Sequence, residues 1–366
     1  MKSLASTLAS TLVPSAVEKL VPYQSARRLG GSGRLWLNAN ELETCAQYGD
    51  LSKGSNNQYN RYPDFLPQDT AQAYLAYCEQ GVGKLDSEIV TVRGADEAID
   101  LLIRTFCTPG NDQIIICPPT YGMYEFCADS FAVTTNKIPL LDNFQLNVEQ
   151  IKTQLPTSSL LFLCSPNNPT GNSINQADII ELLEASKTST LVVIDEAYIE
   201  FSAHQSALHL MNKYPHLMVI RTLSKAFGLA AIRCGFLLAD SSVMAYVNRL
   251  IPPYPIADPS AEIALKALSD TGLQAMSKQT TELIEIRDWF TSELQQLDIV
   301  ETIYSSQTNF VLIKFNAGLN VFNYLVKQGI ITRNQAHEAA LSDCVRITIG
   351  SKKSMLETLN TLKHIQ

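Results

Sequence analysis

The 366-residue sequence lacks several signatures of specialised protein classes. None of its eight cysteines forms a CxxC pair, and its five histidines show no HExxH motif or paired metal-ligand spacing. No apolar run approaches the ~20 residues of a membrane-spanning helix, and Ser and Thr interrupt the apolar residues of the N-terminus. We therefore expect a cytoplasmic protein with reduced cysteines, no metal, no signal peptide and no membrane partner.

The sequence also lacks an excess of positive charge. It has 28 Lys and Arg residues against 36 Asp and Glu residues, which gives a formal net charge of −8. This balance argues against a nucleic-acid partner and against a general affinity for anionic membranes. If the protein binds an anionic small molecule, it has to gather positive charge locally.

What the sequence does contain, from about residue 88, is an alternation of short apolar strings with helical periodicity. Within residues 95–106, apolar side chains recur at spacings of three and four, which indicates one face of a helix. Continuously apolar strands between helices predict an α/β fold with a mostly parallel sheet covered on both faces. The strings are EIVTVRG, QIIICPP, LLFLCSPNN, LVVIDEAY, LMVIRT and CGFLLAD.

The character of the chain changes after the prolines near residue 255. A long helical pattern over 259–297 precedes the strings TNFVLIKF, GIITR and VRITIG, which predict a smaller α+β domain. We therefore predict a large domain over 51–255 and a small domain over 256–366. The polar residues 1–50 are expected to form an arm that packs on the small domain or on a dimer partner.

One lysine, Lys225, directly follows an apolar strand and has apolar neighbours on both sides. Loss of water around an amine disfavours its charged form and leaves a nucleophile. Such a lysine forms Schiff bases with carbonyls, including that of pyridoxal phosphate (PLP). The alternative is a lysine that reaches solvent from the start of a helix.

Two polar residues stand at the ends of other apolar strands. Asp195 ends LVVID, where a carboxylate could pair with a protonated pyridine nitrogen or could cap the next helix. Asn168 lies in SPNNPTG, where its amide could meet a ring hydroxyl or where the segment could be a plain turn. Because parallel strands end at one edge of a sheet, both residues are expected near Lys225.

An anion site is suggested by RGADEAI, in which Gly94 precedes a helix start. Free backbone N–H groups at a helix N-terminus attract phosphate, and glycine allows close approach. Arg233, Thr222 and Ser224 could contribute further donors. Tyr121 could stack on a flat ring or simply pack in the core.

Taken in order, these motifs resemble those of the fold-type I PLP-dependent aminotransferases of class II, and specifically their histidinol-phosphate branch. The resemblance runs from about residue 22 to 350. The matching segments are PYQSARRLGG, WLNANE, RYPD, GADEAI, PPTYGMY, SPNNPTG, DEAYIEF, RTLSKAFGLA, RCGF and VRITIG.

The resemblance implies roles for individual residues. Lys225 would carry PLP as a Schiff base and act as the proton shuttle, with Asp195 on the pyridine nitrogen. Asn168 and Tyr198 would bind the ring oxygen, and Tyr121 would stack on the ring. The positions implied for the cofactor phosphate are Gly94, Ala95, Asp96, Thr222, Ser224 and Arg233.

The resemblance also implies a homodimer in which Tyr62 reaches the cofactor and substrate of the neighbouring subunit. The implied substrate positions are Tyr23, Asn38, Tyr62, Asn168, Arg333 and Arg346, with the two arginines assigned to phosphate and carboxylate groups. The implied reaction is amino transfer between L-histidinol phosphate and 2-oxoglutarate in histidine biosynthesis, which yields imidazole-acetol phosphate and L-glutamate. A broad aromatic aminotransferase, a phospho-threonine decarboxylase and a non-catalytic PLP-fold module are the alternatives.

Overall fold

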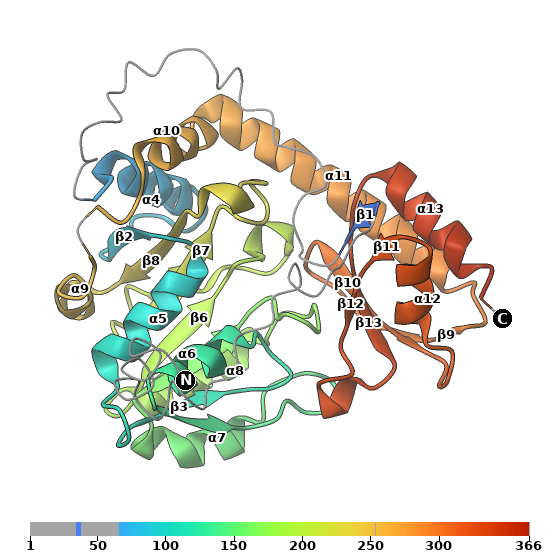
Figure 1. Cartoon of the computed structure of the whole chain (residues 1–366). Coiled ribbons are helices and arrows are strands. Elements are labelled where there is room, and N and C mark those ends of the chain that lie inside the picture. Colours follow the sequence, from blue (N-terminus) through green and yellow to red (C-terminus); the bar gives the residue numbers. More distant parts are fainter. Residues whose placement is uncertain (1–33, 38–65, 253, 366) are drawn as a thin grey trace, which may run out of the picture.

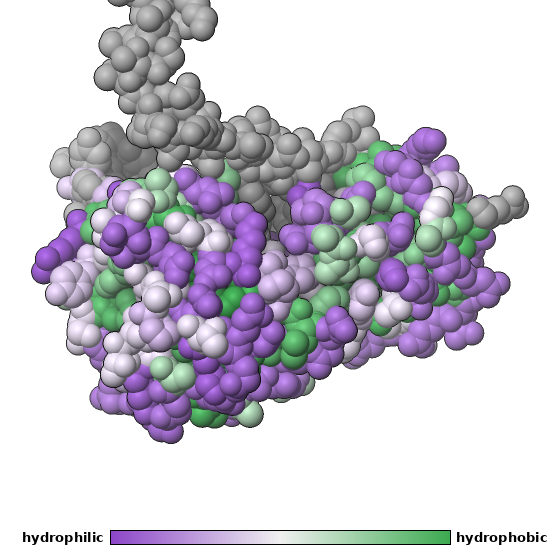
Figure 2. All heavy atoms as spheres, turned by 90° about the horizontal axis from the view of Figure 1, so that it is seen from below, coloured by the Kyte–Doolittle hydropathy of each residue, from purple (hydrophilic) through white to green (hydrophobic). Residues whose placement is uncertain are grey.

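The computed structural model describes residues 34–37, 66–252 and 254–365. The expectations for Tyr23, Asn38 and Tyr62, and for most of the arm 1–50, lie outside these described residues. Within the described part, no helix is long and apolar enough to cross a membrane. The face shown in Figure 2 is mostly hydrophilic, and small hydrophobic areas lie scattered among the hydrophilic side chains.

A seven-stranded sheet forms the centre of the large domain, in the order β2-β8-β7-β6-β5-β3-β4 (Figure 1). Its strands are β2 (Glu88–Val92), β3 (Gln113–Ile116), β4 (Thr134–Lys137), β5 (Leu160–Cys164), β6 (Leu191–Asp195), β7 (Leu217–Thr222) and β8 (Gly235–Ala239). All neighbouring strands are parallel except that β8 runs antiparallel to both β7 and β2. The predicted α/β fold with a mostly parallel sheet is confirmed.

The antiparallel direction of β8 follows from the short connection that precedes it. Between β7 and β8 the chain forms only a loop and the short 3-10 turn η4 (Ala230–Ile232). A parallel neighbour needs a long crossover connection, usually a helix, whereas an antiparallel neighbour does not. The short connection that contains Lys225 therefore fixes the direction of β8.

Helices cover both faces of this sheet (Figure 1). They are α4 (Gln68–Val82), α5 (Ala95–Phe106), α6 (Met123–Ser130), α7 (Val148–Gln154), α8 (Gln176–Ser186) and α9 (Ser241–Val247). Alternate residues of β6 fall into two separate cores, Val192 and Ile194 on one face and Val193 on the other. This alternation follows from the two-residue period of a strand.

The helical pattern expected over 259–297 forms two helices, α10 (Asp258–Ala267) and α11 (Asp270–Leu294). Ser269 separates them, because its hydroxyl donates to Lys266 O (2.7 Å) and accepts from Gly272 N (3.3 Å). A side chain at Gly272 would place its Cβ 2.4 Å from Ala267 O, so the close approach of the two helices requires glycine. The long helix α11 then leads from the large domain to the small one (Figure 1).

The small domain contains an antiparallel sheet in the order β12-β13-β10-β9. Its strands are β9 (Val300–Ile303), β10 (Phe310–Phe315), β12 (Arg333–Asn334) and β13 (Cys344–Thr348), and its helices are α12 (Val321–Lys327) and α13 (Lys352–Leu362). A separate parallel pair joins β1 (Leu35–Trp36) to β11 (Ile330–Ile331). The first described segment therefore pairs with a strand of the small domain.

A buried ion cluster lies behind the carboxyl ends of β6 and β7. Arg221 Nη2 is 2.8 Å from Glu196 Oε2, and Arg221 Nη1 is 3.4 Å from Glu200 Oε1. Ser206 Oγ accepts from Arg221 Nη2 and donates to Glu196 Oε2. Burial raises the pKa of Glu200 from its ordinary 4.5 to about 7, although the nearby Arg221 opposes this shift. Two buried carboxyl groups thus share one guanidinium.

This cluster predicts a specific pH dependence of stability. Between pH 4.5 and 7 the folded protein keeps a proton on Glu200 that the unfolded chain releases. The free energy of unfolding therefore falls as the pH rises through this window. The amide introduced by Glu200→Gln does not titrate. The free energy of unfolding of this variant, taken relative to that of wild type, should therefore rise by about 3 kcal/mol between pH 4.5 and 8. Chemical denaturation across this range measures the difference.

The matched control is Glu285→Gln, which changes an exposed carboxylate on α11. Its free energy of unfolding should track that of wild type at each pH. Parallel pH profiles for Glu200→Gln and wild type would show that Glu200 does not hold its proton in the folded state.

Candidate active site

A cavity of about 520 Å³ lies between the large and small domains. It is bordered by the carboxyl ends of β5, β6 and β7, by the N-terminus of α5, and by the small-domain strands β12 and β13. In parallel-sheet folds, ligands bind at this edge of the sheet. The position of the cavity therefore follows from the strand directions.

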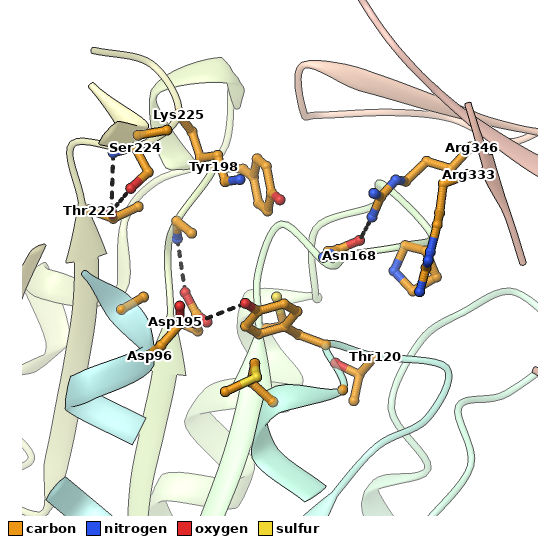
Figure 3. Close-up of a pocket in the computed structure, with 18 of the residues that line it drawn as sticks. Asp96, Thr120, Asn168, Asp195, Tyr198, Thr222, Ser224, Lys225, Arg333 and Arg346 are labelled. Atoms are coloured by element: carbon orange, nitrogen blue, oxygen red, sulfur yellow. Dashed lines mark hydrogen bonds between the residues drawn. The ribbon is translucent and has the colours of Figure 1, made fainter. Parts of the chain in front are cut away.

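The first reactive group in the cavity is Lys225 (Figure 3). Its Nζ lies 5.7 Å from the centroid of the Tyr198 ring. The neighbouring side chains Leu223, Ala226 and Phe227 are buried. The lysine thus projects from an apolar turn into the cavity.

A buried carboxylate, Asp195, stands at the end of β6. Tyr124 Oη donates to Asp195 Oδ2 (2.8 Å), and Ala197 N donates to Asp195 Oδ1 (3.1 Å). Burial raises the pKa of Asp195 from 3.8 to about 6, and these two hydrogen bonds oppose the rise. A cation placed beside Asp195 would stabilise its charged form.

One end of the cavity has the geometry of an anion cradle. Gly94, with φ of 80°, is the N-cap of α5, and a Cβ there would lie 2.6 Å from Arg233 Nη2. Thr222 Oγ1 is hydrogen-bonded to Ser224 Oγ (2.9 Å), as Figure 3 shows. The free backbone N–H groups of α5, the two hydroxyls and the guanidinium converge on this end.

The carboxylate of Asp96 interacts with two side chains at the same end of the cavity. Tyr121 Oη donates to Asp96 Oδ1 (2.8 Å), and Arg233 Nη2 lies 3.1 Å from Asp96 Oδ2. A carboxylate would repel an anion. Any contribution of Asp96 to an anion site therefore comes from its backbone N–H and from holding Arg233 and Tyr121 in place.

The opposite end of the cavity is formed by the small domain. Arg346 donates through Nη1 to Asn168 Oδ1, and its guanidinium lies 5.2 Å from the Phe310 ring centroid. Arg333 lies directly opposite Arg346 in the backbone register of β12 and β13. Its side chain also lines the cavity. Two cationic side chains thus face one end of the cavity from neighbouring strands (Figure 3).

The structure brings together most of the residues singled out from the sequence. Those that line the cavity are Ala95, Asp96, Tyr121, Asn168, Asp195, Tyr198, Thr222, Ser224, Lys225, Arg233, Arg333 and Arg346. Gly94 caps α5 beside them. Tyr23, Asn38 and Tyr62 lie outside the described residues.

Sequence reasoning missed a second group. The additional cavity-lining residues include Thr120, Gly122, Met123, Cys164, Gln335, His337 and Glu338, and Tyr124 acts on the site through Asp195. The PPTYGMY motif already contained Tyr124, which follows Tyr121 by three residues and lies in the first turn of α6. The segment after Arg333 carried no signal beyond its position behind a strand. Among the described residues, no cluster of His, Cys, Asp and Glu could hold a metal ion.

Comparison with known proteins gives a consistent result. The model of the family described as aminotransferase class I and II matches residues 34–362. Histidinol-phosphate aminotransferase 1 of Haemophilus influenzae (strain 86-028NP) is 43% identical over 357 residues, covering 98% of this chain and 99% of the relative.

Solved structures share the fold. The histidinol-phosphate aminotransferase of Clostridium acetobutylicum has a TM-score of 0.81 and 25% identity, covering 90% of this chain and 98% of that one. That of Sinorhizobium meliloti, in complex with pyridoxal-5'-phosphate, has a TM-score of 0.82 and 19% identity, covering 97% of each chain. The family match and the near full-length relative lead to one conclusion: this chain belongs to the aminotransferase class I and II family.

Proposed function

We propose that this protein is a PLP-dependent transaminase that interconverts L-histidinol phosphate and 2-oxoglutarate with imidazole-acetol phosphate and L-glutamate, a step of histidine biosynthesis. The observation that carries the proposal is the cavity itself. It combines Lys225, the buried Asp195 and an anion cradle with a second cationic end. A relative named histidinol-phosphate aminotransferase, 43% identical over 98% of this chain, supports the choice of substrate.

The residues present fit PLP. The cradle at the α5 N-terminus, where a Cβ on Gly94 would meet Arg233, suits the phosphate group. Asp195 offers an acceptor for the pyridine nitrogen, and a protonated nitrogen beside it would offset the burial that raises its pKa. Asn168 and Tyr198 offer polar atoms for the ring oxygen, and Tyr121, which also lines the cavity, is the residue proposed to stack on the ring.

When bound, PLP supplies an electron sink that stabilises negative charge on the substrate carbon. Lys225 would hold the cofactor through Nζ, and the same amine, once free, would move the proton between carbon atoms. Asp195, whose Oδ2 accepts from Tyr124 Oη, would keep a proton on the pyridine nitrogen. Arg333 and Arg346 bind the phosphate and carboxylate groups of the two substrates.

The assembly is a further part of the proposal. We propose that the protein acts as a cytoplasmic homodimer in which Tyr62 completes the neighbouring subunit's site. Tyr23 and Asn38 are proposed as substrate residues on the same grounds of motif resemblance. The net charge of −8 supports local, not general, attraction of an anionic substrate, through the arginines of the cavity.

The direct test is the Lys225→Ala variant. Without the amine, the proton transfer loses its general base, so turnover of histidinol phosphate with 2-oxoglutarate should fall by about 10³-fold or more. Glutamate formation by the purified holoenzyme measures the rate. Parallel assays of carbon dioxide release from phospho-threonine and of aromatic amino donors separate the neighbouring PLP activities. A wild-type protein that forms no glutamate from histidinol phosphate contradicts the proposal.

Removal of the Tyr124 hydroxyl tests the role of Asp195. Because the Tyr124 hydrogen bond opposes the rise in the Asp195 pKa, Tyr124→Phe should raise this pKa further. A hydrogen bond to a charged group is worth about 1.5–3 kcal/mol, so the acid limb of kcat/KM should move up by about one to two pH units. Tyr246→Phe, which changes an exposed tyrosine, is the control. An acid limb that stays in place would rule out this coupling.

The anion cradle is tested by Gly94→Ala. The added Cβ would lie 2.6 Å from Arg233 Nη2 and would strain a φ of 80°. We expect the affinity of the cofactor-free protein for PLP to fall by about tenfold or more, as measured by absorbance titration. Gly318→Ala is a matched control, because its φ is +87° but nothing lies within 4 Å of the new Cβ. Equal affinities in the two variants would disprove the cradle.

A further inference from the structure

The side chain of Gln335 has no role in the site as described above. Only 3% of this residue is exposed, and it lines the cavity. Among the residues that the structure describes, its amide group has no hydrogen-bond partner. Buried polar groups in native proteins are almost always paired, so an unpaired amide at a cavity wall points to a ligand.

The position of Gln335 follows from the strand that precedes it. Arg333 lies directly opposite Arg346, and Gln335 N donates to Cys344 O (3.0 Å), which continues the ladder beyond Asn334. Successive side chains of a strand point to opposite faces, so Gln335 shares the face of Arg333. The amide and the two guanidinium groups therefore line the same wall of the cavity.

The backbone after β12 fixes this arrangement. Ala336 N donates to Asn334 Oδ1 (2.9 Å), and Glu338 N donates to Gln335 O (2.9 Å). These two bonds close a turn that also brings His337 to the cavity. Arg333 and Arg346 lie directly opposite each other on β12 and β13. This wall of the cavity therefore carries two cationic side chains beside the Gln335 amide, and all three groups are hydrogen-bond donors.

A carboxylate and a phosphate group need different numbers of hydrogen-bond donors from this wall. A carboxylate has two oxygens, which one bidentate guanidinium satisfies. A phosphate monoester presents three terminal oxygens and needs a further donor. We propose that Gln335 is a specificity-determining residue that donates its amide N–H to the phosphate of the amino donor, beside Arg333. This inference rests on the proposed function, because it assigns the phosphate of the proposed substrate to this wall.

Gln335→Met tests the inference, since methionine has a similar volume and leaves no polar atom without a partner. In single-turnover reactions of the holoenzyme, kcat/KM for histidinol phosphate should fall by about tenfold, mainly through KM. The value for glutamate should stay within about threefold, because its carboxylates do not need the amide. Assays at pH 8 keep His337 neutral, because burial and the charges of Arg333 and Arg346 lower its pKa.

Gln328→Met is the matched control. Gln328 is an exposed glutamine of the same domain that lines a separate groove on α12 and α13. Its kinetic constants for both amino donors should equal those of wild type. Thermal melting and PLP absorbance verify that the Gln335→Met protein is folded and loaded. An equal loss for both donors, or no loss for either, would overturn the inference.

Sulfate provides a probe that does not depend on the proposed substrate. It should inhibit the glutamate half-reaction competitively, and its inhibition constant should rise by about fivefold or more in Gln335→Met. A wild-type protein that does not use histidinol phosphate would contradict the proposed function. If the sulfate inhibition constant nevertheless differs between wild type and Gln335→Met, the assignment of Gln335 as an anion ligand stands. Equal inhibition constants would refute the assignment itself.

Discussion

The parallel register of β5, β6 and β7 is the constraint on which the site depends. Cys164 pairs with Asp195, and Asp195 pairs with Ile220, so the three strands end at the same level. Asn168 follows the first strand, Asp195 ends the second, and Lys225 follows the third. Three groups that lie far apart in the sequence thereby meet at one edge of the sheet. A slip of one residue in β6 would turn Asp195 to the opposite face.

Behind this edge, the ion cluster of Arg221, Glu196 and Glu200 joins β6 to β7. Glu196 directly follows Asp195, and Arg221 directly precedes Thr222, so the cluster lies one residue from both the carboxylate and the anion cradle. Burying two carboxyl groups beside one guanidinium contributes little net stability, but removing one of the partners is costly. We infer that the cluster holds the two strand ends in a fixed relation.

The sequence predicts the large-domain half of the site well, because that half depends on strand ends. Apolar strings followed by Asp195, Asn168 and Lys225 already indicate where each side chain lies. It does not predict that Tyr124 supports Asp195, because that contact depends on how α6 packs. Nor does it predict the role of Gln335, because the face of a short strand is known only once its register with β13 is known. The break between α10 and α11 was missed because Ser269 fits a helical pattern as well as a cap.

The central claim is that Lys225 is the residue that carries the cofactor. Reduction of the PLP-loaded protein with borohydride, followed by peptide mass spectrometry, tests this claim most directly. A phosphopyridoxyl group on the peptide that contains Lys225, and on no other lysine, is the result that the structure predicts. A reduced protein in which Lys225 is unmodified, or in which the label lies on another lysine, would contradict the account.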